Sequence, residues 1–131
     1  MKWIEPKLLI ADDDRDFRES LGEVFQRRGY ETHLVADGCE AVEFVQATHE
    51  LHLVIFDVHM PRLTGLEALQ QIRDVGTHLL PCILMSAKLD EAIVRQAEEL
   101  DTSGFLAKPF TLRDATSAVE SILKQFYGWE V

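Results

Sequence analysis

Short apolar runs alternate with amphipathic stretches along the whole chain, and this alternation constrains the fold more than any other feature. The apolar runs have the length of strands, and the stretches between them carry apolar residues at helical spacing. Residues 53–56 are apolar without interruption, as expected of a strand that is covered on both faces. A strand–helix repeat of this kind predicts a parallel sheet with right-handed crossovers and helices on both faces.

The pattern predicts five strand–helix units. Strands are expected at residues 8–11, 32–35, 53–56, 82–85 and 104–107, and the fourth helix at about 90–100. Capping-box patterns open three of the helices, at residues 37–40, 64–67 and 111–114. The last helix is expected to bury an inner stripe of Leu112, Ala115, Val119, Ile122 and Phe126. The predicted class is α/β, a doubly wound five-stranded parallel sheet of flavodoxin-like order 2-1-3-4-5.

Length, charge and cysteine content narrow the class of protein. The 131 residues suffice for one core, and we expect a single domain over residues 1–131. A net charge of -10 argues against direct binding to nucleic acid or to an anionic membrane surface. No apolar run has the length of a membrane span or of a signal-peptide core. Cys39 and Cys82 lack zinc-site spacing and are expected to be unpaired, so a cytoplasmic location is favoured.

Polar side chains stand where the predicted strands end. Asp12 and Asp13 follow the first strand, Asp57 the third, Ser86 the fourth and Lys108 the fifth. The carboxyl ends of parallel strands meet at one edge of a sheet, which is where ligands bind in open α/β folds. Strands 1 and 3 are neighbours in the predicted order, so the three carboxylates should lie together.

Three adjacent carboxylates need a cation. Two like charges ~4 Å apart repel by roughly 4 kcal/mol at an effective dielectric near 20, and Mg²⁺ prefers such oxygen ligands. Asp12 and Asp13 are therefore predicted to bind Mg²⁺. Adjacent aspartates after a strand can also simply cap a helix, but Asp14 or Asp16 can take that task. Asp57 is the candidate nucleophile, because a carboxylate can attack phosphorus to form an aspartyl phosphate.

Lys108 and Ser86 complete the predicted site. Lys108 would bring a mobile positive charge to the phosphoryl oxygens, and Ser86 would donate a hydrogen bond to one of them. Taken alone, Lys108 could be an ordinary surface lysine, and Ser86 could be an ordinary turn residue at the end of a strand. Their joint position at strand ends favours a phosphoryl site.

Five motifs together resemble the receiver domain of two-component response regulators, in order and spacing, over nearly the whole chain. They are Ala-Asp-Asp-Asp at 11–14, Asp-Val-His-Met-Pro at 57–61, Gly65, Ser-Ala at 86–87 and Lys-Pro-Phe at 108–110.

The resemblance implies that Asp57 is the phosphoacceptor. It also implies that Asp12, Asp13 and Asp57 bind Mg²⁺, helped by the backbone carbonyl of His59. Lys108 and Ser86 would contact the phosphoryl group, and the peptide bond before Pro109 is expected to be cis.

The resemblance also implies a switch and partners. Ser86 would shift toward the phosphoryl group while Phe105 swings into the vacated space, which would remodel the face made by the fourth helix, fifth strand and fifth helix. A sensor histidine kinase or phosphotransfer protein would supply the phosphoryl group. A downstream effector protein or domain would read the switch, and a homodimer through the same face is an option. The chain would catalyse only its own phosphorylation and dephosphorylation.

Three positions depart from the family pattern. Thr64 stands where relatives often have aspartate, and both residues are good helix caps. Asp101 and Thr102 stand where the family usually has Gly-Ala. Because glycine suits a left-handed helix end, we expect the end of the fourth helix to differ there.

Three other functions fit parts of the pattern. A magnesium-dependent phosphatase would also use an aspartyl phosphate, but the chain has no room for a cap domain. A flavin binder of the same fold needs a phosphate-binding loop after the first strand, which is acidic here. A receiver-shaped scaffold that is never phosphorylated would not need the complete acidic set.

Overall fold

The computed structural model of the chain describes residues 5–48, 50–76 and 79–130. Five strands alternate with five helices in it. The strands are β1 (Lys7–Ala11), β2 (Glu31–Val35), β3 (Leu53–Asp57), β4 (Cys82–Ser86) and β5 (Gly104–Ala107). The helices are α1 (Arg15–Arg27), α2 (Gly38–Ala47), α3 (Gly65–Val75), α4 (Glu91–Glu99) and α5 (Leu112–Tyr127). Each strand predicted from the sequence lies within an observed strand, so the predicted alternation is confirmed.

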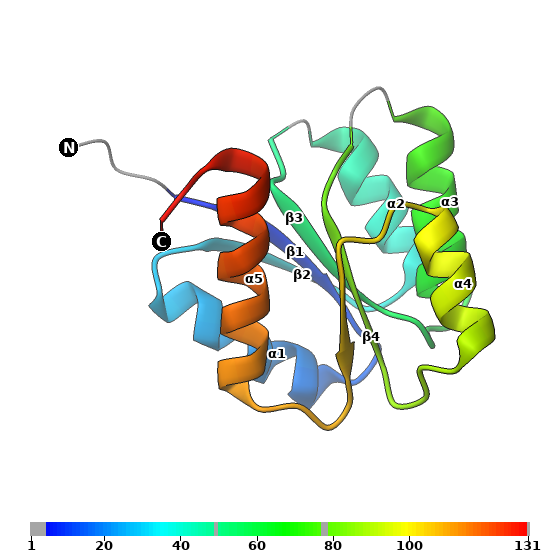
Figure 1. Cartoon of the computed structure of the whole chain (residues 1–131), viewed down its shortest axis with the longest axis horizontal. Coiled ribbons are helices and arrows are strands. Elements are labelled where there is room, and N and C mark those ends of the chain that lie inside the picture. Colours follow the sequence, from blue (N-terminus) through cyan, green and yellow to red (C-terminus); the bar gives the residue numbers. More distant parts are fainter. Residues whose placement is uncertain (1–4, 49, 77–78, 131) are drawn as a thin grey trace.

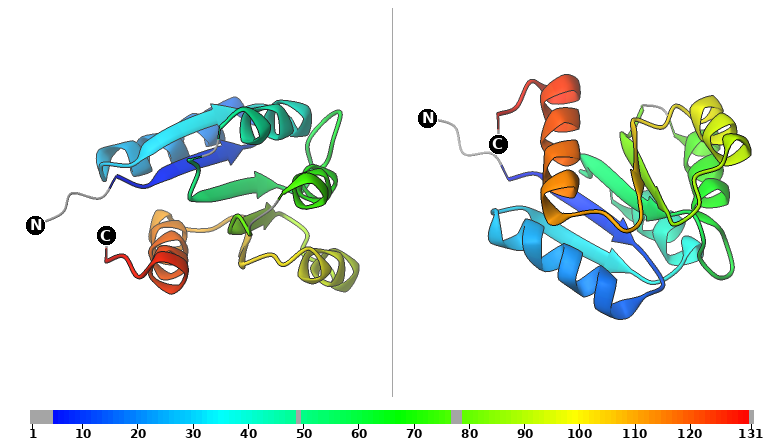
Figure 2. Two further views of the ribbon diagram at one scale, coloured as in Figure 1. Left: turned by 90° about the horizontal axis from the view of Figure 1, so that it is seen from above. Right: turned by 60° about the horizontal axis from the view of Figure 1, so that its bottom comes forward.

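The strands form one parallel sheet in the order β2-β1-β3-β4-β5 (Figure 1). Helices α1 and α5 cover one face of the sheet, and α2, α3 and α4 cover the other, as the view from above in Figure 2 shows. The doubly wound, flavodoxin-like fold is therefore confirmed. The order reverses between β1 and β3, which places their carboxyl ends side by side at the position where such sheets bind ligands.

The uninterrupted apolar runs are explained by burial on both faces. Leu8 and Ile10 of β1 pack toward α1 and α5, whereas Leu9 packs toward α2 and α3. Neighbouring strand residues point to opposite faces, so a strand between two helical layers is apolar at every position. In β3, all five residues are buried, including the charged Asp57 at its end.

Side-chain caps define where the helices begin. Asp14 caps α1 by accepting a hydrogen bond from the backbone N–H of Phe17 at 3.2 Å. The capping boxes predicted at Thr64 and Thr111 are both present. The predicted box at residues 37–40 is only half formed, because the carboxylate of Glu40 accepts the N–H of Ala36 instead.

The inner stripe predicted for α5 is wrong at its two ends. Leu112 and Phe126 are 55% and 36% exposed, whereas Thr116 and Leu123 are buried. The reason is length: the 16 residues of α5 extend about 24 Å. A five-residue strand extends only about 17 Å, so the helix ends project past the sheet.

Among the described residues, no helix is long and apolar enough to cross a membrane.

Candidate functional site

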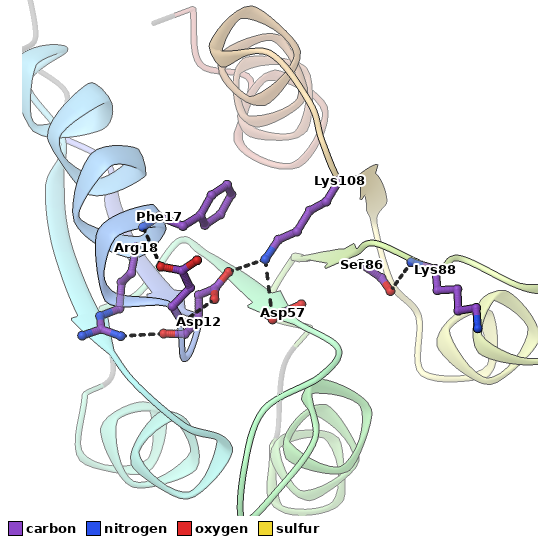
Figure 3. Close-up of polar contacts among 8 residues, drawn as sticks. Asp12, Phe17, Arg18, Asp57, Ser86, Lys88 and Lys108 are labelled. Carbon is purple, nitrogen blue, oxygen red and sulfur yellow. Dashed lines mark hydrogen bonds and ion pairs between the residues drawn. The ribbon is translucent and has the colours of Figure 1, made fainter.

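The four predicted strand ends lie at one edge of the sheet. Asp12 follows β1, Asp57 and Ser86 end β3 and β4, and Lys108 follows β5. Figure 3 shows these side chains around the carboxyl ends of the strands. Because β3 lies between β1 and β4, Asp57 lies between Asp12 and Ser86.

Three carboxylates gather between β1 and β3. Asp12 is fully buried, Asp57 is 6% exposed, and Asp13 is exposed. One oxygen atom from each lies within 4.8 Å of the others. Carboxylate oxygens in this number suit a hard divalent cation that keeps some of its water, so the donor set fits Mg²⁺.

Lys108 reaches this cluster from the edge strand. Its Nζ atom lies 2.7 Å from a carboxylate oxygen of Asp12 and 3.6 Å from one of Asp57. The side chain therefore extends past the ends of β4 and β3 to the residue that follows β1. Its backbone N–H donates to the carbonyl of Ser86 at 2.8 Å, which fixes where the side chain starts. The Lys108–Pro109 peptide bond is cis.

Burial raises the pKa of Asp57, and the neighbouring Asp12 carboxylate raises it further. The Lys108 ammonium and a backbone hydrogen bond from His59 act in the opposite direction. The net effect is a carboxyl group that is harder to ionise than usual. A bound cation would lower the electrostatic cost of ionising it.

Backbone contacts fix the position of Asp57. A Cβ at Gly65 would overlap the backbone carbonyl oxygen of Asp57, so only glycine fits there. The N–H of Gly65 donates to the carbonyl of Val58 at 2.9 Å, and Val58 donates to Met85 at 2.8 Å. The start of α3 is thus packed directly against the end of β3. His59, in the intervening loop, is exposed.

Ser86 lies beside the carboxylate cluster and has a partner of its own. The side chain is fully buried, and its hydroxyl oxygen accepts the backbone N–H of Lys88 at 3.0 Å. Figure 3 shows this hydrogen bond on the side of Asp57 away from Asp12. Contact between Ser86 and a phosphoryl group therefore remains a prediction.

Two residues of α1 also contribute to the site, although sequence reasoning did not place them there. The Arg18 guanidinium donates to the backbone carbonyl of Asp12 at 2.7 Å, which anchors the loop that carries the first two carboxylates. The ring of Phe17 lies against the Lys108 ammonium, 4.3 Å from centroid to Nζ. No sequence pattern signals either contact, because helix periodicity does not specify partners.

The chain just after α4 adopts a left-handed backbone conformation that is unfavourable for the aspartate found there. Asp101 has a φ of 57°, in the left-handed region that favours glycine. Arg73 of α3 donates to the backbone carbonyl of Leu100 at 2.9 Å, which ties the two helices together.

Phe105 of β5 is partly buried and packs against the core on the α4 side. Its swing on activation is still only predicted.

Comparison with known proteins supports one family. Residues 8–120 match the family model described as the response regulator receiver domain. Response regulator MprA of Mycobacterium sp. (strain KMS) is 34% identical over 121 residues, which are 91% of this chain and 51% of that protein. MprA of Mycobacterium leprae is 35% identical over the same shares. The chain therefore spans about half the length of these curated relatives.

Solved structures of chemotaxis response regulators have the same fold as this chain. Chemotaxis protein CheY4 of Vibrio cholerae has a TM-score of 0.84 at 25% identity, covering 92% of this chain and all of that one. CheY in a CheX–CheY–BeF3–Mg²⁺ complex from Borrelia burgdorferi has a TM-score of 0.85 at 25% identity. That match covers 92% of this chain and 90% of the other.

Proposed function

Because this chain belongs to the response regulator receiver domain family of two-component signalling, we propose that Asp57 accepts a phosphoryl group in a magnesium-dependent reaction. One observation supports this most directly. Asp57 is almost fully buried and shares a cluster with Asp12 and Asp13. Among the described residues, the Lys108 ammonium is the only one that reaches this cluster, and it lies 3.6 Å from Asp57.

In the proposed reaction, a carboxylate oxygen of Asp57 forms a bond to phosphorus as the bond to the donor breaks. The electron pair of that bond leaves with the donor group, a histidine nitrogen or an acetate oxygen. Lys108 is placed to turn from Asp12 to the phosphoryl oxygens, because its flexible stem carries a compact charge. Ser86 would leave the N–H of Lys88 and donate to another oxygen.

Mg²⁺ held by Asp12, Asp13, Asp57 and the backbone carbonyl of His59 would neutralise charge on the transferring oxygens. The raised pKa of Asp57 is consistent with this requirement, since the same carboxyl must be ionised to act as a nucleophile. The related CheY from Borrelia burgdorferi is named in a complex with BeF3 and Mg²⁺. Beryllofluoride has the shape of a phosphoryl group, which supports the same chemistry here.

We further propose that the chain is one receiver domain over residues 1–131 that works in the cytoplasm. A sensor histidine kinase or a phosphotransfer protein would phosphorylate it. Ser86 and Phe105 would then change position and alter the surface of α4, β5 and α5, which a downstream effector or a second copy would bind. The conformational change is a population shift between two states. The chain would act on no independent substrate.

Incubation with acetyl phosphate and Mg²⁺, followed by intact-mass measurement, tests the proposal. We expect one added phosphoryl group in the wild type, none in Asp57→Asn and none with excess chelator. Asp74→Asn is the matched control, because Asp74 is an exposed aspartate of α3 whose carboxylate accepts a hydrogen bond from Gln70 of the same helix. It should be phosphorylated like the wild type.

An unchanged mass in folded, magnesium-bound wild type would refute the proposal and favour the unphosphorylated scaffold. Continuous release of phosphate from a small phosphoester would instead favour the phosphatase. Addition of the group to Asp57→Asn would show that another residue is the acceptor.

A further inference from the structure

The ring of Phe17 forms one wall of the space occupied by the Lys108 ammonium. Nζ of Lys108 lies 4.3 Å from the ring centroid, and the Phe17 side chain is partly buried. Figure 3 shows the two side chains approaching each other from α1 and from the segment after β5. The negative face of an aromatic ring attracts a cation at this separation.

Phe17 is itself held in place on two sides. The Asp14 side chain accepts the backbone N–H of Phe17 at 3.2 Å, which anchors the first turn of α1. Phe110 meets the Phe17 ring edge-on, with a centroid separation of 5.6 Å and an interplanar angle of 86°. Because Phe110 follows Lys108 by only two residues, this aromatic pair joins α1 to the segment that carries the lysine.

The ammonium thus has three neighbours of different kinds. Asp12 binds it at 2.7 Å, Asp57 lies at 3.6 Å, and the Phe17 ring contributes an attraction that takes up no hydrogen-bond donor. A lysine stem has four flexible carbons, so the ammonium would otherwise sample many positions. The ring restricts these positions while leaving the N–H groups free to change acceptor.

We propose that Phe17 is a positioning residue for Lys108 in phosphoryl transfer. The cation–π contact keeps the ammonium beside the carboxylates, so that it turns from Asp12 to the phosphoryl oxygens without first leaving the site. The inference rests on the proposed function, because it assigns Phe17 a role in that same reaction. The alternative is that Phe17 only packs against the apolar cluster that includes Leu21 and Val119.

A double-mutant cycle separates the two roles. We expect Phe17→Leu, which keeps an apolar side chain but removes the ring, to slow phosphorylation by acetyl phosphate about three- to tenfold at saturating Mg²⁺. Phe17→Tyr keeps the ring face and should stay within about twofold of the wild type. In a Lys108→Met background, Phe17→Leu should have almost no further effect, because the charge that the ring holds is gone.

Phe44→Leu is the matched control, since Phe44 is a partly buried phenylalanine of α2 that contacts His33 rather than the site. It should leave the rate within about twofold of the wild type. Equal slowing by Phe17→Leu with and without the Lys108 charge would overturn the positioning role. So would a normal rate in Phe17→Leu alone.

A spectroscopic readout tests the contact without phosphorylation. Protons above a ring face are shielded, so the Lys108 ε-methylene signals should lie upfield in the wild type and in Phe17→Tyr, and return to the ordinary position in Phe17→Leu. Wild type that is phosphorylated but shows unshifted Lys108 signals would overturn the positioning role alone. Wild type that shows the shift but is never phosphorylated would overturn the proposed function, and with it the role of Phe17 in the reaction.

Discussion

Gly65 and Asp57 are packed so closely that a Cβ on the glycine would overlap the backbone carbonyl oxygen of the aspartate. The overlap involves backbone rather than a flexible side chain, so relief requires movement of β3 or α3. We therefore expect Gly65→Ala to lower the free energy of unfolding by about 2 kcal/mol and to displace Asp57. Urea denaturation measures the first effect, and the rate of phosphorylation by acetyl phosphate measures the second.

Gly104→Ala is the control for the glycine prediction. A Cβ there would lie 3.4 Å from Cδ1 of Ile122, which is ordinary van der Waals contact. Because alanine is less flexible than glycine in the unfolded chain, this variant should be unchanged or more stable by up to about 1 kcal/mol. Equal stability of the two alanine variants would contradict the close approach of α3 to β3.

Asp57→Asn should stabilise the metal-free protein at neutral pH. Burial raises the pKa of Asp57 in the folded state, so the folded protein binds the proton more tightly than the unfolded chain does. Stability is lost as the pH rises from the unfolded pKa through the raised folded pKa, and the full penalty applies above both. Asparagine removes this penalty, so the variant should have a higher free energy of unfolding than the wild type at neutral pH.

The measurement is urea denaturation of both proteins in chelator across a pH series. The difference in the free energy of unfolding between Asp57→Asn and the wild type should be present at neutral pH. It should vanish below the ordinary pKa range of a carboxyl group, where Asp57 is protonated in both the folded and the unfolded wild type. An advantage that is independent of pH would indicate a packing effect and not an electrostatic one.

Mg²⁺ should stabilise the folded protein, because the three carboxylates come together only in the folded state. At a metal concentration one hundred times the dissociation constant, the free energy of unfolding should rise by about 2.7 kcal/mol. In Asp13→Asn this increment should be smaller, since one ligand is lost. Asp16→Asn, at an exposed position of α1 outside the cluster, should keep it. Thermal denaturation with and without Mg²⁺ gives the comparison, and an undiminished increment in Asp13→Asn would remove that residue from the ligand set.

Asp101→Gly should make the protein more stable by about 0.5–1 kcal/mol. Asp101 has a φ of 57°, which glycine adopts without steric cost, and its backbone contacts do not depend on the side chain. Glu99→Gly, at an exposed position two residues earlier in α4, should instead lose up to about 1 kcal/mol of stability, because glycine weakens helices. Opposite shifts in the urea midpoint are therefore expected, and a loss of stability in both variants would contradict the strain at Asp101.

Cys39 should react with a thiol reagent in the native protein, and Cys82 should not. Cys82 is fully buried in β4, which raises its pKa to about 12. At pH 8, such a thiol is almost entirely protonated, and the reagent cannot reach it. Cys39 is partly exposed. Mass spectrometry after iodoacetamide should show one modification in native protein and two in urea, and rapid native modification of Cys82 would disprove its burial.

Much of the fold was predictable because its signals are local. Apolar runs locate strands, and capping boxes at Thr64 and Thr111 locate helix starts, since each pattern depends on residues close in sequence. The ends of α5 were mispredicted for the opposite reason. Whether Leu112 and Phe126 are buried depends on how far the helix extends past the sheet, which periodicity does not encode.

The order of residues alone determined that a parallel sheet would form and that Asp12, Asp57, Ser86 and Lys108 would stand at its carboxyl edge. Only the folded chain decided which of these groups meet. Lys108 is 96 positions from Asp12, yet it binds that carboxylate at 2.7 Å and approaches Asp57 less closely. Its distance to each acid, the ring of Phe17 beside it and the raised pKa of Asp57 all follow from strand order and burial, and these exist only once distant segments pack together.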